Sequence, residues 1–185
     1  MTNQDTYTSR DEMYFITLKT SHEIRHNELL ANIFDDREYS DILVKALIYL
    51  IDRFKLNLYG FVILSDQVHL ILGTTETEIH EKIEILKRVS AREIMLLIGK
   101  KLNNMDEVRS RKLSELRKVF GSYLNQDETI LWGKNEKFLQ LQRFQRQEHV
   151  IPITSEELLV HLSDKNRNYL QLGADAFTKV MMDRI

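Results

Sequence analysis

The amino-acid sequence predicts an α+β domain with a ferredoxin-like fold, in which a split βαβ unit forms an antiparallel sheet. Short runs rich in β-forming residues alternate with longer runs whose apolar residues recur at helical spacing. These runs follow the order strand, helix, strand, strand, helix, which is the first part of a split βαβ unit. The chain has 185 residues, of which 43% are hydrophobic, enough for one core and too few for two full domains.

The first elements are predicted by two different periodicities. Residues 14–20 alternate aromatic and β-branched side chains between two faces, which predicts a strand. Residues 39–54 repeat their apolar side chains at helical spacing, with Ser40 and Asp41 as the expected cap residues. Residues 58–73 contain two apolar runs joined by a short polar turn, and they predict a β-hairpin.

The next helix is expected to begin at Thr77 and Glu78 and to break near Gly99. The highly charged stretch at about 103–135 is interpreted as a helical insertion. A fourth strand should follow later in the chain, because the split βαβ unit requires one.

The chain is expected to close with an edge strand and a helix. Residues 150–153 include the only proline of the chain and predict an edge strand or a strand start. Ser155, followed by two glutamates and an apolar run, marks the start of a C-terminal helix. Because residues 1–12 are polar, we expect a flexible N-terminus before a single domain over 13–185.

Composition excludes several kinds of chemistry. The chain has no cysteine, so disulfides, thiolate zinc sites and cysteine nucleophiles are excluded. Its apolar runs are too short to cross a bilayer and its polar start is no signal peptide, so we expect a soluble, cytoplasmic protein without a membrane partner. The net charge of −2 argues against nonspecific binding of nucleic acid by bulk charge.

Basic residues nevertheless gather locally, and the clusters predict nucleic-acid contacts. Alternatively, these basic residues belong to ordinary solvated helix faces. Trp132 and Phe138 could stack bases beside the second cluster, or they could belong to the core. The residues of the two clusters are Lys87, Arg88 and Arg92, and Arg143 and Arg146.

Gln67 and His69 form the most informative pair, because alternate residues of a strand share a face. An imidazole nitrogen and an amide oxygen can together hold a divalent cation, although the amide is the weaker ligand. The alternative is a histidine at a strand end that is bonded to a neighbouring carbonyl group.

The hairpin from Tyr59 to Leu72 resembles a motif of the HUH single-tyrosine transposases, in particular the REP-associated tyrosine transposases and their transposase-like relatives. That motif has the form Tyr-x-Φ-Val-Ile-Met-x-Asn-His-Val-His-Leu-Φ-Φ, where Φ is apolar. Residues 14–20 resemble the first strand of the family, and residues 86–94 its basic helix, in family order. His69 matches the second histidine of the motif, and Gln67 replaces the first, so the metal motif is divergent.

The resemblance implies an endonuclease for single-stranded or hairpin DNA that uses Mg²⁺ or Mn²⁺. In the family, a tyrosine of a C-terminal helix attacks the scissile phosphate and forms the phosphotyrosine used in DNA transposition. The Tyr-Ile-x-x-Asn-Pro run of the relatives is absent here, so Tyr169 is the first candidate nucleophile and Tyr123 the second. Each has the alternative of an ordinary packing tyrosine. His161 could supply the missing metal ligand, or it could be a half-exposed helix residue.

We therefore expect a transposase-like protein that binds single-stranded or hairpin DNA, with or without metal-dependent nicking and strand transfer. One alternative is a catalytically inactive, domesticated module that binds nucleic acid. Another is a module that binds a protein through its insertion. A homodimer is the alternative to a monomer, because some members of the family dimerise.

Overall fold

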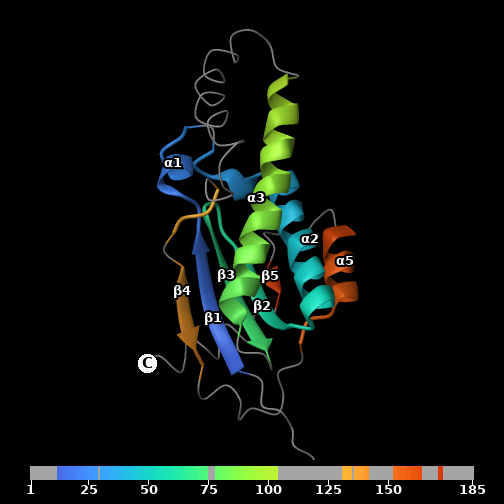
Figure 1. Cartoon of the computed structure of the whole chain (residues 1–185). Coiled ribbons are helices and arrows are strands. Elements are labelled where there is room, and N and C mark those ends of the chain that lie inside the picture. Colours follow the sequence, from blue (N-terminus) through green and yellow to red (C-terminus); the bar gives the residue numbers. More distant parts are fainter. Residues whose placement is uncertain are drawn as a thin grey trace, which may run out of the picture.

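The computed structural model describes residues 12–28, 30–74, 78–103, 131–134, 136–141, 152–163 and 171–172 (Figure 1). The elements in chain order are β1 (Glu12–Lys19), α1 (His22–Arg25), the 3-10 helix η1 (Ile33–Asp35), α2 (Arg37–Phe54), β2 (Asn57–Ile63), β3 (Gln67–Thr74), α3 (Ile79–Asn103), β4 (Lys137–Gln140), α5 (Ser155–Ser163) and β5 (Gln171–Leu172).

The five strands form one sheet in the order β4-β1-β3-β2-β5, and every pair is antiparallel. Strands β1 to β4, with α2 and α3 as the connecting helices, have the order and connections of a split βαβ unit. The predicted α+β, ferredoxin-like fold is therefore confirmed. The short strand β5 extends the sheet beyond β2 and was not predicted.

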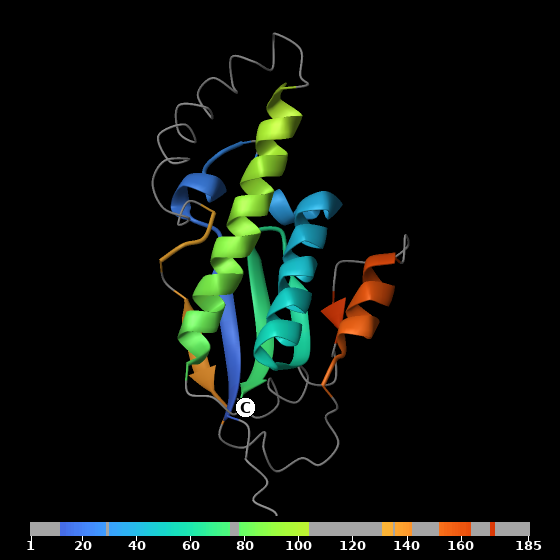
Figure 2. The ribbon, with the colours of Figure 1, turned by 45° about the vertical axis from the view of Figure 1, so that its right-hand side comes forward.

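Helices α2 and α3 cover the same face of the sheet (Figures 1 and 2). The strand residues on that face are buried against apolar residues of the two helices, because both strands and helices place their apolar side chains on one side. In the described part of the chain no helix covers the opposite face, which we call the open face. The buried residues include Ile16, Leu18, Val68 and Leu70 from the strands and Leu43, Leu47, Ile83, Leu86 and Ile94 from the helices.

Helix α2 begins two residues earlier than its apolar pattern indicates. Asp36 is its N-cap, and its carboxylate accepts a 2.9 Å hydrogen bond from the backbone N–H of Glu38. The prediction of Ser40 as a cap was wrong, because this side chain is buried in the first turn and donates to the Phe34 carbonyl at 2.6 Å. The apolar period marks the packed face of a helix, and its first turn can precede that face.

Helix α3 runs through Gly99 to Asn103, so the predicted break at Gly99 was wrong. A glycine inside a helix costs about 1 kcal/mol relative to alanine, which the packing of a long apolar face can offset. Thr77, the predicted start, lies outside the described residues, and the helix begins at Ile79.

The predicted insertion at about 103–135 lies largely outside the described residues. Its end is part of the core, because Trp132 is only 1% exposed and forms a β-bridge with Thr20. The backbone N–H of Gly133 also donates to the Lys19 carbonyl at 2.8 Å. These contacts lead the chain directly into β4, which is the expected fourth strand.

The C-terminal helix is confirmed and begins at Ser155, with Thr154 as its cap. The backbone N–H of Thr154 donates to the Glu157 carboxylate at 2.7 Å, and the Glu157 N–H donates back to the Thr154 hydroxyl at 3.2 Å. Before it, Ile153 forms one bridge with Leu58, and residues 150–151 of the predicted edge strand lie outside the described residues. Residues 1–11 also lie outside them. Of the helices that are described, none combines the length and the apolar character that a bilayer crossing needs.

Candidate functional site

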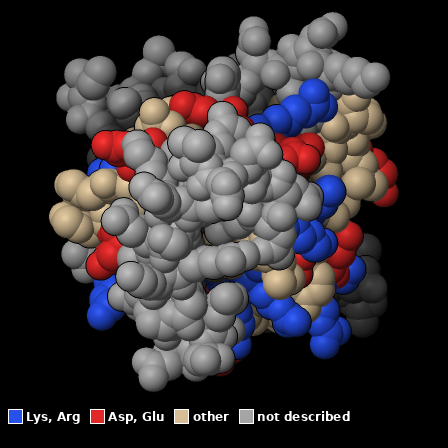
Figure 3. Space-filling model, turned by 90° about the horizontal axis from the view of Figure 1, so that it is seen from above, with Lys and Arg blue, Asp and Glu red and all other residues tan. Residues whose placement is uncertain are grey.

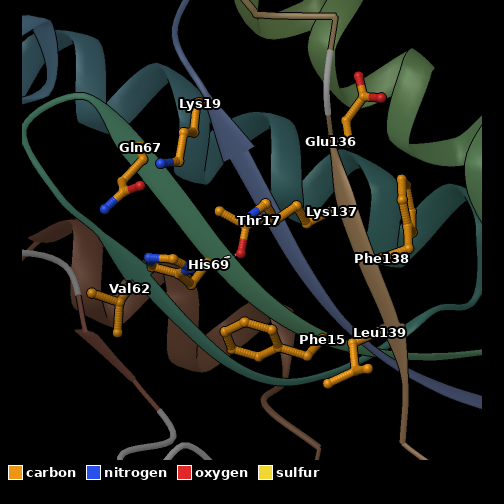
Figure 4. Close-up of a pocket in the computed structure, with 10 residues that line it drawn as sticks. All are labelled: Phe15, Thr17, Lys19, Val62, Gln67, His69, Glu136, Lys137, Phe138 and Leu139. Atoms are coloured by element: carbon orange, nitrogen blue, oxygen red, sulfur yellow. Dashed lines mark hydrogen bonds between the residues drawn. The ribbon is translucent and has the colours of Figure 1, made fainter.

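The register of the sheet gathers polar side chains on the open face. Thr17 of β1 lies opposite His69 of β3, and Lys19 lies opposite Gln67. Because alternate residues of a strand share a face, all four side chains point to the same side of the sheet. They line a pocket of about 860 Å³, the sheet pocket (Figure 4). Its lining residues are Phe15, Thr17, Lys19, Val62, Gln67, His69, Glu136, Lys137, Phe138 and Leu139.

The His69 ring is held by two neighbours on β1. Its Nδ1 lies 3.0 Å from the Thr17 hydroxyl, and the ring stacks on Phe15 with a centroid distance of 5.6 Å and an interplanar angle of 19°. The alternative of a histidine bonded to a neighbouring carbonyl group is not what the structure shows, because the partner of Nδ1 is a hydroxyl. Burial, and then the positive charge of Lys19, lower the pKa of His69 below its ordinary value. Both effects favour the neutral imidazole over the imidazolium.

Lys19 brings a positive charge to the two predicted metal ligands. Its Cα pairs with that of Gln67, and its side chain is exposed at the end of β1. Figure 4 shows the Lys19 ammonium bending toward Gln67, with His69 further along the same strand as Gln67. The positive charge of Lys19 also acts on the imidazole, since it contributes to the lowered pKa of His69.

The donors around Gln67 and His69 do not fit Mg²⁺ or Mn²⁺. Such ions prefer several oxygen ligands, carboxylates among them. Here two neutral donors lie beside an ammonium group, and Glu136 of the same pocket is ion-paired with Lys87. Among the described residues, no group of three or more histidine, aspartate or glutamate side chains could hold a metal ion.

His161 lies on the other side of the sheet. Its ring meets the Phe61 ring edge-on at a centroid distance of 5.8 Å, and Phe61 is buried on the face covered by the helices. The next residue, Val62, lines the sheet pocket. The structure therefore does not bring His161 together with Gln67 and His69.

Lys87 is a buried structural residue on the inner side of α3. It is 7% exposed and forms ion pairs with Glu136, just before β4, and with Glu84 at 2.8 Å. Burial alone lowers its pKa, but the hydrogen bonds to the two carboxylates outweigh burial, so the pKa is raised. Its ammonium is thereby committed to protein carboxylates.

Of the other predicted cations, Arg88 and Arg92 are not part of the sheet pocket. Arg88 and Arg92 are exposed on α3, which covers the opposite face of the sheet, and Arg143 and Arg146 lie outside the described residues. On the described surface seen in Figure 3, Lys and Arg side chains lie next to Asp and Glu side chains. The basic residues of the pocket are Lys19 and Lys137 instead.

Neither candidate nucleophile can be placed, because Tyr123 and Tyr169 lie outside the described residues. Tyr169 stands two positions before Gln171, and Gln171 pairs with Val62 next to His69. Trp132 belongs to the core, and Phe138 lines the pocket with its ring 4.0 Å from that of His80.

Seven of the ten pocket residues were not among the predicted site residues: Phe15, Thr17, Lys19, Val62, Glu136, Lys137 and Leu139. Phe15, Thr17 and Lys19 alternate along the first predicted strand, so their shared face was readable from the sequence. Lys137 carried no such signal, because β4 has only four residues and no clear alternation.

The lowered pKa of His69 can be measured directly. We expect an imidazole pKa below 6.5 in a proton NMR titration of the folded protein, since burial and Lys19 both disfavour the imidazolium. In a Lys19→Met variant the pKa should rise toward 6.5 while burial keeps it below. An unchanged pKa in this variant would show that the ammonium does not act on the ring.

Comparisons with known proteins give distant likenesses of fold. No protein-family model matches the sequence, and no curated protein matches it. A protein of Deinococcus radiodurans R1 described as a "putative transposase" is 21% identical with a TM-score of 0.45, over 77% of this chain and 88% of that chain. A REP-associated tyrosine transposase bound to a REP hairpin is 12% identical with a TM-score of 0.40, over 77% of this chain and 63% of that chain. At this distance the likeness concerns the fold, and membership of the HUH family stays a prediction.

Proposed function

We propose that this protein is a transposase-like protein that binds single-stranded or hairpin DNA in the sheet pocket. The observation that carries the proposal is the pocket itself, where two lysines lie near a stacked aromatic pair on the face of the sheet opposite α2 and α3. Proteins that bind single strands combine cations for the backbone with aromatic rings on which bases stack. The description of the protein as transposase-like rests on the sequence motif of the β-hairpin.

The pocket contains side chains that can contact both the bases and the phosphates of a single strand. Phe15 is half-buried and already stacks with His69, so a base can extend that stack. Lys19 and Lys137 are both exposed and lie on neighbouring strands, and both can contact phosphates. The amide of Gln67 can bond with a base edge or a phosphate.

Binding can be tested by fluorescence anisotropy with labelled single-stranded and hairpin oligonucleotides. We expect Phe15→Ala to weaken binding by roughly tenfold, because stacking of one base contributes about 1–3 kcal/mol. The matched control is Tyr49→Ala, since Tyr49 is an aromatic residue of α2 that is 47% exposed and far from the pocket. Affinity should also fall steeply with salt. If neither oligonucleotide binds at low salt, the proposed function is wrong.

Strand transfer through a phosphotyrosine is a second candidate function. It is favoured by β5, because Gln171 pairs with the strand next to His69 and Tyr169 stands two positions before it. In this reaction the tyrosine oxygen forms a bond to phosphorus, and the broken P–O bond leaves a free hydroxyl end on the DNA. Incubation with labelled hairpin DNA, with Mn²⁺ and with chelator, should give a covalent adduct on a denaturing gel. An adduct that survives Tyr169→Phe but not Tyr123→Phe would move the role to Tyr123.

A further inference from the structure

We propose that Lys19 provides the positive charge beside Gln67 and His69, so that a DNA phosphate binds at this site without a divalent cation. The inference rests on the proposed function and specifies how the sheet pocket treats the DNA backbone. It departs from the metal requirement that the sequence resemblance implies.

The Lys19 backbone is held firmly at the rim of the pocket. Its carbonyl accepts a 2.8 Å hydrogen bond from the Gly133 N–H, and the N–H of Thr20 donates to the Asp66 carbonyl at 2.9 Å. The strand pairing of Lys19 with Gln67 fixes the direction in which the side chain leaves the sheet. The ammonium is therefore presented to the site by an ordered strand and not by a free loop.

The charge of Lys19 is available for an anion from outside the protein. Other lysines near the helices are neutralised, since Lys101 pairs with Asp36 at 2.6 Å and with Glu38 at 2.5 Å. Lys87 is likewise held by two carboxylates. Among the described residues, no carboxylate forms an ion pair with Lys19. An exposed ammonium that faces a pocket is a suitable contact for a phosphate.

The Thr17 hydroxyl completes the arrangement by orienting His69. The hydroxyl lies 3.0 Å from Nδ1 and can donate to it or accept from it; in the tautomer in which it donates, the neutral ring carries its proton on Nε2. In this tautomer the Nε2–H group can donate to a phosphate oxygen. The site then presents the Lys19 ammonium, the Gln67 amide N–H and the His69 Nε2–H, which are three donors suited to a phosphodiester.

The first test measures hairpin DNA affinity by anisotropy in EDTA and in Mn²⁺. The wild-type affinity should agree within about twofold between the two buffers, and Lys19→Gln should weaken it by about tenfold in EDTA, because a charge-assisted hydrogen bond is lost. Lys45→Gln, which removes an exposed lysine of α2, should leave the affinity unchanged. If the DNA binds only with Mn²⁺, this inference is wrong and the proposed function stands. If the DNA binds in neither buffer, both are wrong.

The second test asks whether Lys19 itself keeps a cation out. We expect no saturable Mn²⁺ binding to the wild type at millimolar concentration by electron paramagnetic resonance. Lys19→Glu places a carboxylate beside Gln67 and His69 and should bind Mn²⁺ at least about tenfold more tightly. The same charge change in Lys45→Glu should add no such binding, and His69→Ala should remove it from the Lys19→Glu variant. Tight Mn²⁺ binding by the wild type that His69→Ala abolishes would overturn the inference.

Discussion

Replacing Trp132 with alanine is expected to lower the free energy of unfolding by about 3 to 5 kcal/mol, measured by urea denaturation followed by circular dichroism. The side chain is 1% exposed and stacks on Phe34 with a centroid distance of 5.5 Å. Its indole N–H donates to the Ser90 hydroxyl at 3.0 Å. Alanine removes these contacts together and leaves a cavity where η1, α3 and the end of the insertion meet.

Two further variants separate the parts of this effect. Trp132→Phe keeps an aromatic ring and loses the indole N–H, so it should lower the free energy of unfolding by less than Trp132→Ala does. Ser90→Ala should lower the free energy of unfolding by about 1 kcal/mol, because it leaves the buried indole N–H without its acceptor. If Trp132→Ala kept the wild-type stability and weakened DNA binding instead, the side chain would be a base-stacking residue and not a core residue.

Trp132 also shows why the limits of the insertion could not be read from the sequence. A single aromatic residue near arginines suits both a core and a nucleic-acid surface, and local composition does not separate them. Its burial depends on the bridge to Thr20 and on the Ser90 hydroxyl of α3, which are distant in sequence. Such long-range contacts are specified by the fold as a whole.

The elements that were predicted correctly are those with long apolar patterns. Helix α2 repeats buried residues along its length, and the hairpin alternates around a polar turn, so local sequence was sufficient. Strand β4 has four residues that are partly or fully exposed, and it exists because it pairs with β1. Strand β5 has two residues and gave no pattern.

The candidate site was predictable only within single strands, each taken by itself. Alternation placed Gln67 and His69 on one face, and in the structure both line the pocket. Which residues lie opposite them depends on the β1–β3 register, which sets Lys19 against Gln67 and Thr17 against His69. The resemblance to the transposase family predicted a set of metal ligands on this face. The β1–β3 register instead places the ammonium group of Lys19 there.

Replacing Lys87 with methionine is the second change for which we expect a large effect, a loss of about 2 to 3 kcal/mol in the free energy of unfolding. The exposed fraction of the side chain is 8% for Lys87 and 17% for Glu136, so the variant leaves a largely buried carboxylate without its partner. The pair joins α3 to the residue just before β4, and its loss should loosen β4 first. Because the pKa of Lys87 is raised above 10.5, this contribution is complete below pH 10.5 and is lost as the pH rises through the folded pKa.

The controls for Lys87→Met decide between a structural residue and a phosphate contact. Arg92→Met removes an exposed cation from the same helix and should change stability by less than about 0.5 kcal/mol. Adding Glu136→Gln to Lys87→Met should recover about 1 kcal/mol, because the stranded negative charge is removed. Since Lys87 is committed to two carboxylates, the affinity of the folded Lys87→Met protein for hairpin DNA should stay within about twofold of wild type. A large loss of affinity at unchanged stability would instead make Lys87 a phosphate contact and not a structural residue.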